Sequence, residues 1–462
     1  MAVAAKPGIP QRPVDPARLA AGRILHDVLE EGAYANLSSI RLLDRTDLNA
    51  LDRRFASALI YGTLSRIITI DWLLDKLSRR PLSELEPWLR TFLRLGVWQL
   101  RWSRSIPPSA AINETVSLIR KMSNPGAAGY ANAVLRQLLR EPIPLPEGNP
   151  SVLYSLPPEL FGYLRKWYGP AEAVELAQSF LREDIPVTAR VNCLRLSRNQ
   201  AALDLQAAGV DCEAGRYCPE ALLLDLHGQP VRSLAAWQQG NLMIQDEAAM
   251  LVGHAADPSS GQTIIDLCAA PGGKTCHLAE KTADQCKILA FDSHPERLKL
   301  VEENASRLGL ASITCQVGDA TGKGMDPALA ASADLVIADV PCSGLGLLAR
   351  KPEIRLTMNH EKIIGLYPLQ AAILDYAATL VRPGGALIYS TCTINPAENI
   401  ERVRAFLAGH SDSYALEELS SRLPQALLEH PDLAETAAFG WIQILPDRHG
   451  LDGFFIARIR RN

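Results

Sequence analysis

The stretch TIIDLCAAPGGKT, residues 263–275, decides the fold of the C-terminal half of the chain. A short apolar run is followed by a glycine pair and then by a helical pattern, which predicts a strand, a tight turn and a helix. Gly272 and Gly273 let the backbone come close to a ligand, and the N-terminus of the following helix favours polar or anionic groups. A tight turn without a ligand is the alternative interpretation.

The turn lacks both common phosphate-binding motifs. Gly-Lys-Thr is present, but a P-loop also needs a glycine five residues before the second glycine of the pair, where this chain has Cys268. The G-x-G-x-x-G spacing of dinucleotide-binding turns is missing as well. We therefore expect a cofactor without a pyrophosphate, such as S-adenosylmethionine.

Strand and helix patterns alternate over residues 246–462. Nearly continuous apolar strands that alternate with helices are typical of a doubly wound parallel sheet, so we expect a Rossmann-like α/β domain. The tail, residues 440–461, is expected to add two antiparallel strands. The other expected strands are TIIDLCA, KILAFD, ITCQVGDA, ADLVIADV and GALIYSTCT, with helices near residues 274–282, 295–308 and 361–381.

The rest of the chain divides into further segments. Helical spacing of apolar residues predicts an all-α bundle over residues 17–140, after a disordered lead at 1–16. Four prolines in residues 141–150 predict a linker. Residues 151–245 mix helical patterns with strands such as PVTARVNCL and EALLLDL and predict a small α+β module. Asp246 is expected to cap the helix that leads into the last domain.

Charge is distributed unevenly along the chain. Residues 1–141 hold 20 Lys and Arg against 13 Asp and Glu, a net of +7, whereas the rest carries a net of −11. A basic module predicts an anionic partner such as nucleic acid, although spread charge can also serve solubility alone. The segment RTFLRLGVWQLRWSR, residues 90–104, interleaves Arg with Trp. These Trp rings could stack on bases, but an amphipathic helix with Trp in the core is the favoured interpretation.

The cysteines and the N-terminus indicate the cellular compartment of the protein. Because no Cys pair has C-x-x-C spacing, and His277 and His360 lack ligand spacing, we expect no metal. Scattered single thiols are typical of the cytoplasm. The Pro-rich N-terminus is not a signal peptide, and no uncharged run approaches the ~18 residues of a membrane span. We expect a cytoplasmic monomer without a membrane partner. The nine thiols are Cys193, Cys212, Cys218, Cys268, Cys276, Cys286, Cys315, Cys342 and Cys392.

Acidic residues follow successive predicted strands. Asp292 ends the second strand of the α/β domain, where a carboxylate can accept hydrogen bonds from ribose hydroxyls. Asp319 follows the third and could contact an adenine edge. Each could instead cap the next helix. The carboxyl ends of parallel strands share one edge of the sheet, so we expect a ligand crevice there.

Two thiols follow the next two strands. Asp339 and Cys342 follow the fourth strand in IADVPCSG, and Cys392 follows the fifth in IYSTCT. A single cysteine at a strand end is more often structural, but two that converge beside a cofactor turn favour chemistry. A thiolate that adds to carbon 6 of a pyrimidine makes carbon 5 nucleophilic toward a methyl donor, and a base must then remove the carbon 5 proton. Asp339 is the candidate to hydrogen-bond the ring nitrogen.

These motifs resemble a known family. DLCAAPGGKT, DVPCSG, STCT and DGFFIARI, in this order, are similar to the RNA cytosine-5 methyltransferases. Together with TLSRIITIDWLLDKL, SAAINETV and ANAVLRQLL, they resemble the bacterial 16S rRNA enzymes of the Sun, or RsmB, type, whose N-terminal part is similar to the RNA-binding factor NusB. The resemblance covers about residues 17–460.

The resemblance implies a role for each site residue. It makes Cys392 the covalent nucleophile and Cys342 the cysteine that assists breakdown of the adduct. It places S-adenosylmethionine against Asp292, Asp319 and Asp339, and against the turn formed by Cys268, Ala269, Ala270, Pro271, Gly272, Gly273 and Lys274. The implied substrate is 16S rRNA, from which the target base must be extruded.

Four alternatives stay open at this point. A DNA cytosine-5 methyltransferase would use Cys342 for the attack. An amino-group methyltransferase would need no covalent thiol and has an Asn/Asp-Pro-Pro-aromatic motif in place of Asp-Val-Pro-Cys. The substrate could also be tRNA or 23S rRNA. A non-catalytic RNA-binding or antitermination factor could have kept an inactive methyltransferase domain.

Overall fold

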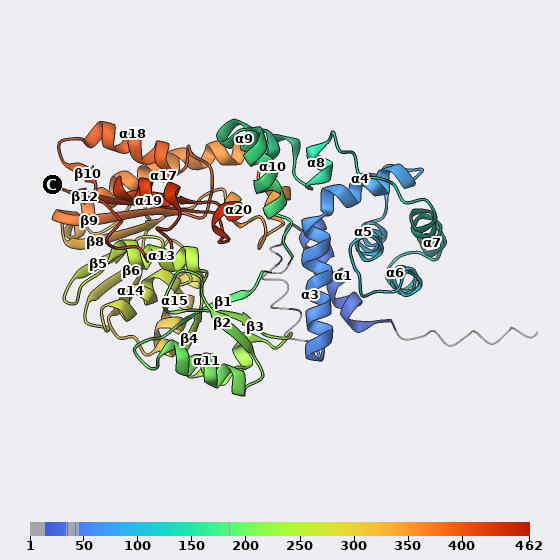
Figure 1. Ribbon diagram of the computed structural model, residues 1–462, viewed down its shortest axis with the longest axis horizontal. Coiled ribbons are helices and arrows are strands. Elements are labelled where there is room, and N and C mark those ends of the chain that lie inside the picture. The colour runs from blue at the N-terminus through green and yellow to red at the C-terminus, as the bar shows by residue number, and fades with distance from the viewer. Residues whose placement is uncertain (1–13, 34, 36–41, 43–45, 184) are drawn as a thin grey trace, which may run out of the picture. The chain divides into compact units, whose positions relative to one another are not determined.

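The computed structural model describes residues 14–33, 35, 42, 46–183 and 185–462 (Figure 1). The chain divides into two compact units, one that ends at Leu156 and one that begins at Pro157. Most of the predicted disordered lead, residues 1–13, lies outside the described residues. Asp15 accepts a hydrogen bond from the backbone N–H of Arg18 and caps the first helix.

The described part of the N-terminal unit is helical, as predicted. Proline occupies the first position of most of its helices, where its fixed φ suits a helix and its missing N–H costs nothing. The helices are α1 (Pro16–Glu30), α3 (Ala50–Ser65), α4 (Ile67–Leu77), α5 (Pro87–Arg101), α6 (Pro108–Met122), α7 (Pro125–Arg140) and α8 (Pro150–Leu153).

Close helix contacts form the core of this unit. A Cβ on Gly22 would lie 2.2 Å from Cε1 of Phe92, and one on Gly62 would lie 2.3 Å from Cε2 of Trp98. α5 therefore packs its aromatic side chains against glycines of α1 and α3. Trp98 is only 5% exposed, which supports the core interpretation of the Arg-Trp segment for this residue and leaves it unable to stack on a base.

The middle module is a four-stranded antiparallel sheet with helices, as the α+β prediction requires. The strand order is β2-β3-β1-β4, and α11 packs Ala201 and Leu205 onto the sheet. β2 was not predicted, because its sequence DCEA is largely exposed and shows no apolar alternation. The elements are α9 (Pro158–Tyr168), α10 (Pro170–Ser179), β1 (Val187–Val191), α11 (Arg198–Ala207), β2 (Asp211–Ala214), β3 (Ala221–Asp225), α12 (Ala235–Gln238) and β4 (Leu242–Ile244).

The C-terminal part is a doubly wound sheet, which confirms the predicted fold class. The strand order is β10-β12-β9-β8-β5-β6-β7, with β11 paired to β12. The five strands from β9 to β7 are parallel, and β12 is antiparallel to β9. The strands are β5 (Thr263–Asp266), β6 (Lys287–Asp292), β7 (Ile313–Val317), β8 (Ala333–Asp339), β9 (Val381–Thr391), β10 (Tyr414–Leu416), β11 (Trp441–Ile444) and β12 (Phe454–Arg461).

Helices cover both faces of this sheet (Figure 1). Successive strand residues face opposite layers: Ile264 belongs to the core with α13 and α14, and Ile265 to the core with α17 and α18. This double burial explains why the strands are apolar throughout. The helices are α13 (Glu247–Ala256), α14 (Gly273–Lys281), α15 (Pro295–Leu308), α16 (Ile354–Thr357), α17 (His360–Leu380), α18 (Ile400–His410), α19 (Pro431–Ala438) and α20 (Pro446–His449).

Within the part of the chain that the structure describes, one helix, α17, is long and apolar enough to cross a membrane by length and composition alone. Its residues Ile373, Leu374 and Ala377 are buried in the core formed with β8 and β9. We therefore interpret α17 as a core helix of the α/β domain.

Candidate active site

The carboxyl ends of the parallel strands bring the predicted site residues to one edge of the sheet. Asp266, Asp292, Asp339 and Thr391 are the last residues of β5, β6, β8 and β9. β5 has β6 on one side and β8 on the other, so the chain changes direction across the sheet at β5. Such a switch point opens a crevice in which α/β sheets bind ligands.

The turn after β5 needs a glycine at its tightest point. Gly272 has φ +102°, and a Cβ there would lie 3.1 Å from Cα of Val301 on α15. Its N–H donates to the carbonyl of Ala269 over 2.7 Å, and Ala269 donates to the carbonyl of Phe291 over 2.9 Å. Asn304 donates to the carbonyl of Pro271 over 3.0 Å. The turn is thus held from β6 and α15 while α14 starts at Gly273.

A buried carboxylate, Asp266, lies behind this turn. It is 1% exposed and accepts hydrogen bonds from Thr275 Oγ1 at 2.7 Å and from the backbone N–H of Cys268 at 3.3 Å. Burial raises its pKa to about 6. Sequence reasoning did not select Asp266, although its position at the end of the first strand was a usable signal.

Asp292 and Asp319 both make local contacts. Asp292 is 4% exposed, and its Oδ1 accepts from the backbone N–H of His294 at 3.0 Å. Oδ1 of Asp319 accepts from both the backbone N–H and the hydroxyl of Thr321, at 2.9 and 2.8 Å, and these bonds lower the pKa of Asp319. Each carboxylate therefore accepts from the backbone N–H two residues later in a local turn, and neither caps a helix as the sequence alternative expected.

Asp339 connects the turn after β5 to strand β9. Its Oδ2 accepts from Lys274 Nζ at 2.6 Å, and its Oδ1 accepts from Ser390 Oγ at 2.7 Å. Burial by itself would lower the pKa of Lys274, but the charge and hydrogen bond of Asp339 outweigh it and raise that pKa. Lys274 is therefore a cation at neutral pH, and the pair spans the crevice from α14 to β8.

The structure brings the two predicted thiols together. Cys342 follows β8, Cys392 follows β9, and their Sγ atoms lie 3.4 Å apart. Both are free cysteines. The hydrogen bond between them raises the pKa of Cys342 well above its usual value and lowers that of Cys392, which the charges of Lys351 and Lys274 also lower. Cys392 is thus the thiol that ionises first, and its thiolate can accept the S–H of Cys342.

Comparisons with known proteins follow the same division of the chain. A family model described as 16S rRNA methyltransferase RsmB/F matches residues 254–460, and a NusB family model matches residues 15–140. A model of the RsmF/B-like ferredoxin-like domain matches residues 160–231. The probable ribosomal RNA small subunit methyltransferase B of Synechocystis sp. (strain ATCC 27184 / PCC 6803 / Kazusa) is 35% identical over 456 residues, which cover 96% of this chain and 99% of the relative.

The chain belongs to the RsmB/F family of 16S rRNA methyltransferases. A probable ribosomal RNA small subunit methyltransferase B from Bacillus subtilis (strain 168) is 34% identical and covers 93% of this chain and 95% of its own length. The crystal structure of PH0851 matches with a TM-score of 0.81 and 26% identity, covering 97% of this chain and 99% of that one. The resemblance to the 16S rRNA enzymes of the RsmB type, including the NusB-like N-terminal part, is confirmed.

The middle module of this RsmB/F protein reaches the turn through one buried side chain that sequence reasoning missed. Arg190 on β1 is fully buried and pairs with Glu280 of α14 through bonds of 2.9 and 2.8 Å. Its Nη1 donates to the carbonyl of Gly273 at 2.8 Å and also to Gln245. The available signal was a charged residue inside an apolar strand pattern. The module is therefore part of the support of the site.

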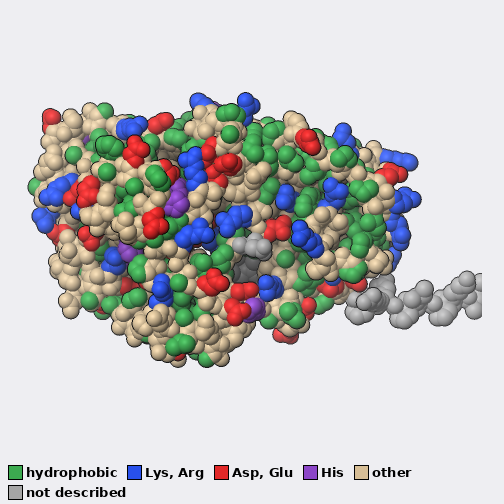
Figure 2. Space-filling view, viewed as in Figure 1, with side chains coloured by type: hydrophobic (Ala, Val, Ile, Leu, Met, Phe, Trp, Pro, Cys, Tyr) green, Lys and Arg blue, Asp and Glu red, His purple; other side chains and the backbone are tan. Residues whose placement is uncertain are grey.

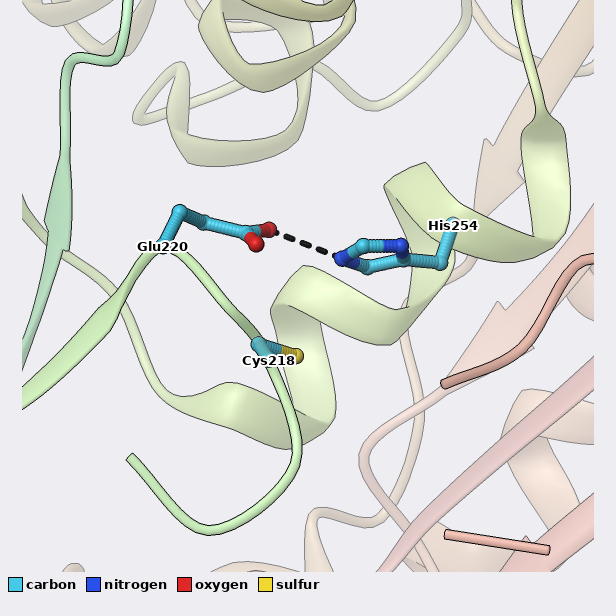
Figure 3. Close-up of side chains that lie close together, drawn as sticks. All are labelled: Cys218, Glu220 and His254. Carbon is cyan, nitrogen blue, oxygen red and sulfur yellow. Dashed lines mark hydrogen bonds and ion pairs between the residues drawn. The ribbon is translucent and has the colours of Figure 1, made fainter. Parts of the chain in front are cut away.

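A Cys-Glu-His cluster joins the same module to the α/β domain. Cys218, Glu220 and His254 have ligand atoms within 4.8 Å of one another (Figure 3). Oε1 of Glu220 accepts from His254 at 2.9 Å and lies 3.0 Å from Nε2 of His277, while burial lowers the pKa of His277 to about 3. Two imidazoles already share this carboxylate oxygen, which explains the cluster as a link between the segment just before β3 and the helices α13 and α14.

Proposed function

We propose that this protein transfers a methyl group from S-adenosylmethionine to carbon 5 of a cytosine in 16S rRNA, through a covalent adduct with Cys392. The observation that carries the proposal is the 3.4 Å contact between the two Sγ atoms, through which Cys342 can donate its S–H to a thiolate on Cys392. It favours the thiolate on Cys392, which is the form that attacks. The rival assignment, attack by Cys342, would need the opposite direction of this hydrogen bond.

The turn and the acidic strand ends fit the methionine and nucleoside parts of the cofactor. Gly272 keeps the turn free of a side chain, and the backbone N–H groups at the start of α14 would face the carboxylate of the cofactor. Asp292 would accept from ribose hydroxyls, and Oδ2 of Asp319 would face the adenine. When bound, the cofactor supplies an electrophilic methyl group.

The residues of the chain attack the base, stabilise the developing charge and assist breakdown of the adduct. The Cys392 thiolate adds to carbon 6 of the flipped cytosine, which makes carbon 5 nucleophilic toward the methyl group. The Lys274–Asp339 pair lies beside Ser390, two residues from Cys392, where it can hydrogen-bond the ring nitrogen as negative charge develops there. After transfer, the carbon 5 proton must leave before Cys392 is eliminated, and we assign the assistance of this breakdown to Cys342.

The helical unit supplies a surface for RNA. Figure 2 shows Lys and Arg side chains gathered along the edge of this unit where Figure 1 places α7. Such a surface binds phosphates without reading the sequence. This reaction takes place in the cytoplasm, where rRNA is found. The exposed basic residues of α6 and α7 are Arg120, Lys121, Arg136 and Arg140.

Two cysteine variants test the proposal. Cys392→Ser should abolish both methyl transfer and any covalent RNA adduct, whereas Cys342→Ser should accumulate the adduct and fail to release it. Denaturing gels of protein mixed with 16S rRNA and cofactor measure both results. An adduct that persists in Cys392→Ser and disappears in Cys342→Ser would reverse the assignment. Bisulfite sequencing of 16S rRNA, 23S rRNA and tRNA from cells with and without the gene identifies the substrate.

A further inference from the structure

A carboxylate that the proposed mechanism does not use lies directly behind the two thiols. Glu398 is fully buried and lies six residues after Cys392, just before α18. Its Oε2 accepts from the backbone N–H of Ser343 at 2.8 Å and from Nε2 of Gln370 at 2.9 Å. A buried carboxylate needs such donors, because an unpaired one is costly.

The other oxygen of Glu398 connects the same two loops. Oε1 accepts from the hydroxyl of Ser343 and from Nδ2 of Asn395 at 3.0 Å. Ser343 directly follows Cys342, and Asn395 lies three residues after Cys392. One carboxylate therefore binds the loop of each cysteine, and hydrogen bonds to an ionised group are stronger than those between neutral groups.

A third element fixes this arrangement. Gln370 of α17 donates both to Glu398 and to the carbonyl of Pro341 at 3.0 Å, and Pro341 directly precedes Cys342. The hydroxyls of Ser343 and Thr393 lie 2.7 Å apart. The backbone on both sides of Cys342 is thus tied to Glu398 or to its partner Gln370.

We propose that Glu398 is a positioning residue that holds the two cysteine loops together, so that the S–H of Cys342 points at the sulfur of Cys392. This inference rests on the proposed function, in which Cys392 attacks the base. An S–H donor is weak, and a shift of more than about half an ångström between the loops would lose the 3.4 Å contact. Glu398 hydrogen-bonds neighbours of the two thiols, Ser343 and Asn395, and its negative charge also helps to raise the pKa of Cys342.

The Glu398→Gln variant tests the role with little change of shape. Both oxygens of Glu398 accept from donors, so the amide group of Gln places a donor against another donor and loosens one loop. We expect the pH midpoint for alkylation of Cys392 by iodoacetamide to rise by about one unit, which leaves about tenfold less thiolate near neutral pH. Mass spectrometry of the Cys392 peptide measures this in the free protein.

The matched control is Glu401→Gln, on the exposed first turn of α18, which should keep the wild-type alkylation profile. In Glu398→Gln, kcat for methyl transfer should fall about tenfold, in step with the thiolate fraction. The Kd for S-adenosylmethionine, measured by calorimetry, should stay within about twofold, because the turn at Gly272 lies between β5 and α14 rather than on the cysteine loops.

Two results would overturn the inference. One is a wild-type alkylation profile in a folded Glu398→Gln protein. The other applies if Glu398→Gln does not fold. Ser343→Ala, which keeps the backbone donor and removes one hydroxyl, should then raise the pH midpoint for alkylation of Cys392 by a smaller amount. An unchanged alkylation profile in Ser343→Ala would refute the positioning role. Alkylation needs no RNA, so this test can fail while the cytosine adduct still forms, and the reverse also holds.

Discussion

The two sides of the crevice are held in different ways. The turn side, residues 266–275, depends on one strained glycine position and on a buried ion pair from another module. The cysteine side, residues 340–346 and 391–399, is held by several hydrogen bonds from backbone and neutral side chains that gather around the carboxylate of Glu398. Where one residue supplies most of the support, its substitution should remove most of that support. Where many residues share the support, each substitution should remove only a small part of it. Single substitutions should therefore have unequal effects on the two sides.

The largest effect is expected for Arg190→Met. Removing this side chain leaves Glu280 buried without its partner, which should lower the free energy of unfolding by about 3–5 kcal/mol. It also releases the carbonyl of Gly273, so the affinity for S-adenosylmethionine should fall. Urea unfolding and calorimetry measure the two results. Arg232→Met, an exposed residue of the same module, is the control. Equal stability of the two variants would show that the turn side does not depend on this ion pair.

The second effect depends on pH, at Asp266. Its folded pKa of about 6 lies above the ordinary value of 3.8, so the fold favours the protonated acid. That stabilisation is complete below pH 3.8 and is lost as the pH rises through 6, by up to about 3 kcal/mol. Asp266→Asn lacks this titration, so the stability of the wild type relative to the variant should decline between about pH 4 and 6. If the free energies of unfolding of the two proteins changed in parallel with pH, this prediction would be wrong.

A pair of glycine variants gives the third effect. Gly272→Ala forces a Cβ into a positive-φ position against Val301 and should cost about 1–2 kcal/mol. A Cβ on Gly273 would meet Gln245 at an ordinary 3.6 Å, so Gly273→Ala should cost less. Thermal unfolding of both variants measures the difference. Similar melting temperatures of the two variants would show that the turn does not require glycine at position 272.

The smallest effect is expected on the cysteine side, for Thr391→Val. This change removes one 2.6 Å hydrogen bond to Asn399, whose side chain keeps its bonds to Thr393 and Gln443. The cost should be about 1 kcal/mol. Chemical unfolding measures it. A loss of unfolding free energy as large as that of Arg190→Met would show that the two sides of the crevice are not supported differently.

Much of the fold was predictable because it depends on local patterns. Apolar strands, the glycine turn and the helical spacing gave the doubly wound sheet, and parallel neighbours then implied that Cys342 and Cys392 would converge. β2 was missed, since an exposed edge strand needs no apolar pattern. The ion pair of Arg190 with Glu280, 90 residues apart in the chain, was missed because neither partner carries a local signal for the other.

The closeness of the two sulfurs has a consequence outside the reaction itself. Free thiols 3.4 Å apart need only a small movement to form a disulfide. An oxidant that removes two electrons and two protons from the pair would join Cys342 to Cys392 and withdraw both from chemistry at once. We expect methylation to stop under oxidative stress and to resume once a dithiol reductant reopens the bond, so that rRNA modification follows the redox state of the cell.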